Sequence, residues 1–179
     1  MTKIVKRNGR IILNDELGVG KRLVAISSAI VYKSEWPLLI VCPQVLQVLW
    51  KEEFVKWIPN FDQSKIQIYS GAPGEELRNN AAIFIVSYQN LLSPQSCSFD
   101  ALRAKHFQVA IIDEASVLKK KEARWEESII NFFTQMKRVL LLTGSMLTSN
   151  PIDIHNLVKI VRPDCIPDFL RFSQRFCDP

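Results

Sequence analysis

The chain has 179 residues, of which 47% are hydrophobic and 23% are charged, so it is long enough for one well-packed domain and too short for two full ones. Its apolar runs, such as PLLIVC at 37–42, fall far below the roughly 18 residues of a membrane helix, and its first ten residues contain no apolar signal segment. The formal charge of +5 favours a polyanionic partner but is also common in other soluble proteins, and we expect a soluble, intracellular protein with no membrane partner.

Four cysteines, Cys42, Cys97, Cys165 and Cys177, lie far apart without a C-x-x-C spacing, and only two histidines could join them. This pattern argues against a structural zinc site. We therefore expect reduced, partly buried thiols.

Six short apolar runs alternate with amphipathic stretches along the chain. The runs are nearly continuous in hydrophobicity and rich in β-branched residues, as expected of strands covered on both faces. The alternation predicts right-handed βαβ crossovers and a mostly parallel sheet, with ligands at the carboxyl ends of its strands. In chain order we expect strands at 10–13, 38–42, 66–69, 82–86, 109–112 and 139–142, and helices at 21–32, 45–57, 124–136 and 152–160.

A glycine-containing loop follows the first predicted strand and opens the first long helix. Backbone N–H groups in such a loop, together with the positive end of the helix, form a cradle for phosphates. Gly18 and Gly20 permit a close approach of the backbone, and Lys21 would reach the β and γ phosphates of a nucleotide. The general template G-x-x-x-x-G-K-[ST] is only partly met, because Asp15 replaces the first glycine and Arg22 replaces the hydroxyl residue. A chance strand–turn–helix remains an alternative.

Two acids follow the buried run at 109–112. Asp113 and Glu114 leave an apolar strand together, and buried carboxylates are costly unless they meet a cation. In a nucleotide site the first acid holds Mg²⁺, usually through water, and the second positions or deprotonates the attacking water. The alternative is an acidic turn without a catalytic role.

A third polar segment ends the last predicted strand. Thr143, Gly144 and Ser145 follow the run at 139–142, and their small hydroxyl side chains could relay the state of a bound phosphate. Three polar segments, each at the carboxyl end of a predicted strand, thus indicate one site.

Together these motifs resemble those of the first RecA-like lobe of the Swi/Snf-type ATPases in helicase superfamily two. DELGVGKR at 15–22 resembles motif I, usually D-E-x-G-x-G-K-T, and DEAS at 113–116 resembles motif II. LLTGS at 141–145 resembles motif III, and the segments at 37–59 and 83–91 resemble motifs Ia and Ib. The segments EWPLLIVCP at 35–43 and PDFLRFSQRFCD at 167–178 are similar to the annealing helicases (HARP-like or SMARCA-like), which rewind single-stranded DNA at stalled replication forks.

The resemblance implies an α/β, RecA-like three-layer P-loop fold. A single lobe would span 1–165, and a C-terminal helical segment at 166–179 would lead towards a second lobe that this chain lacks. ATP would be the cofactor, with Mg²⁺ held by Asp113, in a nuclear DNA-repair protein whose partners are forked DNA and the second lobe. The implied nucleotide-binding residues are Asp15, Glu16, Leu17, Gly18, Val19, Gly20, Lys21 and Arg22; Asp113 and Glu114 would be catalytic, and Ser116, Thr143, Gly144 and Ser145 would couple nucleotide to DNA.

Four positions depart from the family pattern. Arg22 removes the hydroxyl that binds Mg²⁺, Ser116 replaces a histidine, Lys120 an asparagine and Met146 a proline. The Arg22 guanidinium could hold phosphate oxygens bidentately, whereas hydrolysis depends on the metal that bridges the β and γ oxygens. We therefore expect nucleotide binding to survive better than turnover, and the isolated chain to be at best a very slow ATPase.

The resemblance also implies a DNA surface across the top of the lobe, at motifs Ia and Ib. The lysines after motif II would neutralise phosphates, although a solvated surface run explains them equally well. Trp50 and Trp57, at helical spacing beside Leu46 and Phe54, are expected in the core or an interface rather than in base stacking. The implied DNA contacts are Gln44, Gln47, Ser87, Tyr88, Gln89, Lys119, Lys120 and Lys121.

Three functions remain open at this point. The first is a motor lobe of a DNA-translocating, strand-annealing ATPase. The second is a non-catalytic descendant that serves as a nucleotide- or DNA-binding interaction module. The third, a metabolic P-loop kinase, fits poorly because it needs a Ser or Thr in place of Arg22 and leaves motifs Ia, II and III unexplained.

Overall fold

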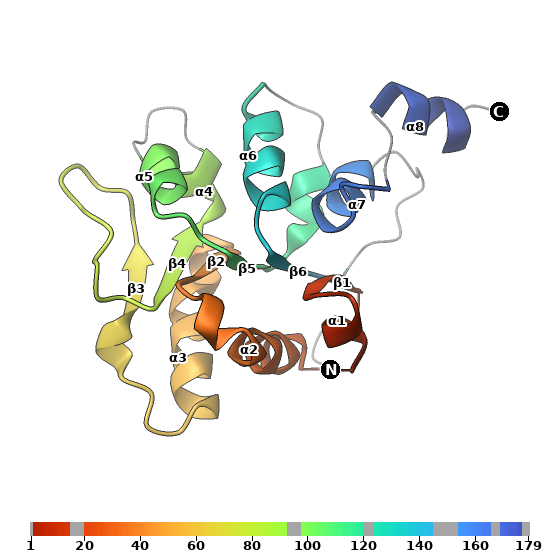
Figure 1. Ribbon diagram of the computed structural model, residues 1–179. Helices are drawn as coiled ribbons and strands as arrows, with labels where there is room; N and C mark the ends of the chain where they lie inside the picture. Colours follow the sequence, from red (N-terminus) through yellow and green to blue (C-terminus); the bar gives the residue numbers. More distant parts are fainter. Residues whose placement is uncertain are drawn as a thin grey trace.

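A computed structural model describes residues 2–14, 20–92, 98–119, 124–144, 154–165 and 169–176 of the chain. Its centre is a six-stranded sheet in the order β1-β6-β5-β2-β4-β3, in which every pair of neighbouring strands is parallel (Figure 1). The strands are β1 (Arg10–Asn14), β2 (Leu38–Cys42), β3 (Ile66–Tyr69), β4 (Ile83–Ser87), β5 (Val109–Ile112) and β6 (Arg138–Thr143).

The central strands are buried along their whole length because helices cover both faces of the sheet. Every residue of β2, β4 and β5 is buried. Successive side chains of a strand point to opposite faces, so Leu39 and Val41 join one hydrophobic cluster while Leu38 and Ile40 join the other. Two separate cores, one on each face, follow from this alternation.

The helices form an outer layer on each face (Figure 1). The core on one face contains residues of α1 (Thr2–Lys6), α2 (Lys21–Val31) and α3 (Gln47–Trp57). The core on the other face contains residues of α4 (Tyr88–Leu92), α5 (Ser98–Ala104), α6 (Arg124–Thr134) and α7 (His155–Val161). Near α7 lies α8 (Phe169–Phe176), whose Phe172 ring is 5.0 Å from the ring of His155. The 3₁₀ turns are η1 (Lys33–Glu35), η2 (Gln44–Leu46), η3 (Gln63–Lys65) and η4 (Ala115–Lys119).

The predicted α/β fold with a parallel sheet is confirmed. The six predicted strands are present within one residue at each end, and the predicted helix at 45–57 begins as η2 before it continues as α3. The helices α1, α4 and α5 were not predicted. The division at residue 165 into a lobe and a following segment stays a prediction.

Two features are absent from the described residues. None of the described helices combines the length and the apolarity that a membrane span needs. Among the same residues, no three His, Cys, Asp or Glu side chains come together as a metal site would require. The described cysteines are Cys42, which is buried, and Cys165, which is exposed, and both are free thiols.

Candidate functional site

The start of α2 and the end of β5 meet at the carboxyl edge of the sheet. A cavity of about 290 Å³ lies there, lined by Gly20, Lys21, Arg22 and Leu23 from α2 and its cap, by Glu53 and Trp57 from α3, and by Asp113 and Glu114 after β5. Ligands of parallel sheets bind at this edge. The structure thus brings the described part of motif I and the acids of motif II to one cavity.

Gly20 adopts a backbone conformation that suits the start of this helix. It is the N-cap of α2, with φ of 82° and ψ of 25°, a left-handed conformation that glycine adopts without steric cost. No side chain caps the first turn of α2, and that turn carries no acidic residue. The positive end of the helix is therefore not neutralised by its own side chains. Asp15 to Val19, the rest of the predicted phosphate loop, lie outside the described residues.

Asp113 is held in place by four hydrogen bonds with neutral groups. The indole N–H of Trp50 donates to its Oδ2 at 3.0 Å, and the backbone N–H of Glu114 donates to its Oδ1 at 3.0 Å. Its own backbone N–H donates to the carbonyl of Val41 at 2.8 Å, and its carbonyl accepts from the Tyr88 hydroxyl at 2.7 Å. Because both backbone and carboxylate are fixed, this carboxylate has a defined position and direction.

Arg22 forms an ion pair with the same carboxylate. Its Nε lies 3.4 Å from Oδ2 of Asp113, where the side chains are 32% and 5% exposed, respectively. The centre of its guanidinium is 5.9 Å from the Trp50 ring, within the range of a cation–π contact. The arginine that replaces the expected hydroxyl therefore lies on the residue that was predicted to hold Mg²⁺.

Buried titratable groups behind the cavity are kept neutral. Burial, and to a smaller extent the nearby charge of Asp113, raises the pKa of the Cys42 thiol to about 12. Burial also raises the pKa of Tyr88, again with a contribution from Asp113. Around neutral pH neither group carries charge. The cationic side chains that line this cavity are Lys21 and Arg22.

The described residues fit a magnesium ion poorly. The site offers one buried carboxylate, Asp113, whose Oδ2 already accepts from Trp50 and pairs with Arg22. Position 22 supplies a cation instead of a hydroxyl ligand, and a second cation next to the first is repelled. Asp113 as a metal ligand therefore stays a prediction that this geometry does not favour.

The remaining predicted residues lie as follows. Glu114 lines the cavity with a φ of 52°, an uncommon conformation for a residue other than glycine. Ser116 is partly buried in η4, Thr143 is fully buried at the end of β6, and Gly144 is exposed beside it. Ser145, Lys120 and Lys121 lie outside the described residues, and Lys119 ends η4. The coupling roles of these positions stay predictions.

Three side chains of the predicted DNA surface are buried, which argues against direct contact with DNA. Ser87 is fully buried and its Oγ accepts from the N–H of Asn90, while Tyr88 is 5% exposed and bonds to Asp113. Gln47 is also buried, and its amide donates to the carbonyl of Ile85. These three side chains are therefore directed to partners inside the protein rather than to solvent. Gln44 and Gln89 are exposed and remain candidates for DNA contact.

Sequence reasoning missed the contribution of α3. Trp50 was expected to be core, and it is fully buried, but its indole N–H also fixes Asp113. Glu53 and Trp57 line the cavity one and two turns further along the helix, where Glu53 accepts from the Trp57 indole. The signal was available only in part, because a buried tryptophan needs an acceptor for its N–H but the sequence does not indicate which residue supplies it.

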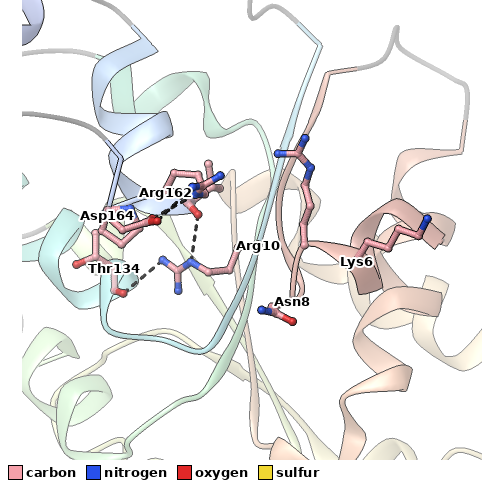
Figure 2. A pocket seen from close by; sticks show the side chains of 9 residues that line it. Lys6, Asn8, Arg10, Thr134, Arg162 and Asp164 are labelled. Atoms are coloured by element: carbon pink, nitrogen blue, oxygen red, sulfur yellow. Dashed lines mark hydrogen bonds and ion pairs between the residues drawn. The ribbon is translucent and has the colours of Figure 1, made fainter.

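A second cavity, of about 570 Å³, lies at the amino edge of the sheet and is rich in cations. Figure 2 shows Arg10 between the ends of α6 and α7, where it donates to the carbonyls of Thr134 and Val161 at 3.3 Å. Arg162 pairs with Asp164 at 3.1 Å in the same view. Since these two cations are engaged with the protein itself, this cavity is a weaker candidate for an anion site.

Comparisons with known proteins agree with the motifs at the carboxyl edge. The model of the SNF2-related domain family matches residues 1–179. The chain is 30% identical over 174 residues to the human DNA annealing helicase and endonuclease ZRANB3, covering 97% of this chain and 16% of that protein. It is 34% identical over 174 residues to SWI/SNF-related matrix-associated actin-dependent regulator of chromatin subfamily A-like protein 1 of Xenopus tropicalis, covering 97% and 18%. The chain thus spans less than a fifth of these relatives.

Two solved structures share the fold. The SWI2/SNF2 ATPase core of Sulfolobus solfataricus, in complex with dsDNA, superposes with a TM-score of 0.73 at 22% identity, covering 98% of this chain and 36% of that one. The Hef helicase domain of Pyrococcus furiosus superposes with a TM-score of 0.63 at 18% identity, covering 92% and 36%. At these identities the likeness concerns the fold.

Proposed function

The chain belongs to the SNF2-related domain family, and on this premise we propose that it is the first, nucleotide-binding lobe of a DNA-dependent ATPase of the annealing-helicase type. One observation carries the proposal. Gly20 and Lys21 at the start of α2, and Asp113 and Glu114 after β5, line a single cavity. A helix N-terminus with a lysine attracts phosphates. An acid near the terminal phosphate is needed to activate the water that attacks it.

Different side chains of this cavity bind the nucleotide and activate the attacking water. Lys21 reaches the outer phosphates, and the amides at the start of α2 bind their oxygens. Glu114 orients or deprotonates the attacking water. Arg22 stands at the position where the family has a metal-binding hydroxyl, so hydrolysis in this chain is slow while binding persists.

The partners follow from the same family. One relative is named a DNA annealing helicase, and one structural neighbour was solved with dsDNA, which supports DNA as the partner of this lobe. We propose forked DNA as the substrate, repair of stalled replication forks as the process and the nucleus as the location. We also propose that a second RecA-like lobe, in the same protein or on another chain, completes the catalytic site; the chain covers about a third of each of the two solved structures.

Nucleotide binding is the first test of this function. Isothermal titration with ATP should give a measurable affinity for the wild type that Lys21→Ala lowers by about tenfold or more, because a charge-assisted bond to phosphate is lost. Lys6→Ala, the same change in the cavity at the amino edge, should bind like the wild type. Equal affinities in all three proteins would contradict the proposal.

DNA-stimulated phosphate release separates the motor lobe from a non-catalytic module. The Arg22–Asp113 ion pair is the observation that favours the module, since it opposes the metal needed for turnover. Slow release that forked DNA accelerates would support the motor lobe. DNA binding that ignores nucleotide, with no release, would support the module.

A further inference from the structure

Both carboxylate oxygens of Asp113 already have partners within the protein. Its Oδ2 accepts from the buried indole of Trp50 at 3.0 Å and lies 3.4 Å from Nε of Arg22. The remaining oxygen, Oδ1, accepts from the backbone N–H of Glu114. The negative charge that would attract a divalent ion is therefore already balanced by Arg22, a cationic side chain of the protein itself.

The guanidinium of Arg22 has N–H donors besides the one that contacts Asp113. Its contacts with the described residues are the ion pair through Nε and the approach to the Trp50 ring. Its two terminal amino groups make no hydrogen bond or ion pair within that part of the chain. A guanidinium is a planar fork with five N–H donors, which matches the oxygens of a phosphate. One edge of the fork thus contacts Asp113, and among the described residues nothing occupies the donors of the other edges.

Arg22 lies at the cavity of the proposed nucleotide site. Arg22 lies one residue after Lys21 in the first turn of α2, and both line the cavity with Gly20. The side chain is 32% exposed, so a ligand can reach it. The Trp50 ring flanks the guanidinium and, through its N–H, also fixes the carboxylate that anchors it.

Resting on the nucleotide site proposed above, we propose that Arg22 replaces the divalent cation, so that this site prefers a nucleoside triphosphate without bound metal to its magnesium complex. Asp113 is then a positioning residue for Arg22, and Arg22 determines which form of the nucleotide is bound. A metal-free triphosphate carries more negative charge than its magnesium complex and has free oxygens for the guanidinium. The magnesium complex brings a second cation close to Arg22, and like charges at short range in a partly buried site repel.

The test compares ATP affinity with excess EDTA and with excess MgCl₂ by isothermal titration. The wild type should bind ATP about tenfold more tightly in EDTA. Arg22→Thr, which restores the hydroxyl, should reverse this preference. Arg22→Lys should keep the preference for the metal-free form with weaker binding, because an ammonium is a point charge without the bidentate fork.

Arg7→Thr makes the same change in the cavity at the amino edge and should behave like the wild type in both buffers. Tighter wild-type binding in MgCl₂, or the same preference in the wild type and Arg22→Thr, would overturn the inference and leave the proposed function intact. Absence of ATP binding in both buffers would instead overturn the proposed function. Circular dichroism confirms that each variant is folded before its affinity is interpreted.

Discussion

The two edges of the sheet each present an arginine beside a cavity, and the two arginines are held in opposite ways. At the amino edge, the Arg10 guanidinium donates to the carbonyls of Thr134, Met136, Ile160 and Val161. At the carboxyl edge, Arg22 is tied to the protein through Nε, at 3.4 Å from Asp113. One cation thus joins β1 to the ends of α6 and α7, while the other retains donors for a ligand.

Arg138 extends the same contrast. It donates from Nε and Nη2 to the two carboxylate oxygens of Glu35 at 2.9 Å and from Nη1 to the carbonyl of Asn8 at 2.8 Å. Its guanidinium also lies 4.6 Å from the ring centre of Tyr32. At the amino edge, then, charges stabilise the fold, and at the carboxyl edge a charge is left where parallel sheets bind their ligands.

Replacing Arg10 should give the largest loss of stability. A small loss would contradict the structural role of arginines at the amino edge. Arg10→Met leaves the helix-end carbonyls without their donor, and a buried polar group without a partner costs about 1–3 kcal/mol. We expect a loss of about 3 kcal/mol in the free energy of unfolding, because water can satisfy some of these carbonyls. Urea denaturation measures it.

The matched control lies in the same cavity. Arg7 carries the same charge and lines the same cavity, but its side chain is exposed. Arg7→Met should change stability by no more than about 0.5 kcal/mol. Similar losses in the two variants would mean that cavity charge, rather than the contacts of Arg10, matters for folding.

The sheet was predictable because its information is local. Buried parallel strands are short, continuous apolar runs, so β2, β4 and β5 could be located from the sequence alone. The five-residue helices α1 and α4 and the seven-residue α5 are too short to show a helical period, which explains why they were missed. The carboxyl-edge site could be anticipated because its motifs directly follow predicted strands.

The contacts that decide chemistry were not predictable in this way. Arg22 and Asp113 are 91 positions apart, and Trp50 and Asp113 are 63 apart. No periodic pattern joins such pairs, because they depend on how α2 and α3 pack beside β5. The same holds for Arg10, whose acceptors are more than 120 positions away and are backbone atoms that carry no sequence signal.

Two glycines allow the packing at the two edges of the sheet to be compared, since both have a positive φ but different surroundings. Gly9, at the amino edge, has a φ of 70°, and an added Cβ would lie 2.8 Å from Cδ of Arg138 and from the Tyr32 ring. Gly20, at the carboxyl edge, has a φ of 82°, and no described atom lies within 4 Å of an added Cβ. Backbone strain alone costs about 1 kcal/mol, so Gly20→Ala should lose about that much.

Gly9→Ala should lose about 2 kcal/mol or more, because displacing the Arg138 side chain and the Tyr32 ring adds to the strain. Chemical denaturation of the two alanine variants gives the difference directly. If Gly20→Ala lost as much stability as Gly9→Ala, the carboxyl edge would be as tightly packed as the amino edge, and the contrast between them would fail.

The smallest effect concerns the pH dependence of the Arg138–Glu35 pair. The hydrogen bond from Arg138 lowers the pKa of Glu35 below its ordinary value of 4.5, so the unfolded chain takes up this proton at a higher pH than the folded protein. The stabilisation is therefore complete above about pH 4.5 and is lost as pH falls through the lower, folded pKa. With both side chains about one-fifth exposed, this stabilisation should amount to about 1 kcal/mol.

Between pH 6 and pH 3 the wild type should lose about that much more unfolding free energy than Glu35→Gln, whose neutral amide cannot titrate. Parallel curves for the two proteins would show that Arg138 acts through Asn8 and Tyr32 alone, and that the amino edge is held by packing and backbone contacts rather than by this ion pair.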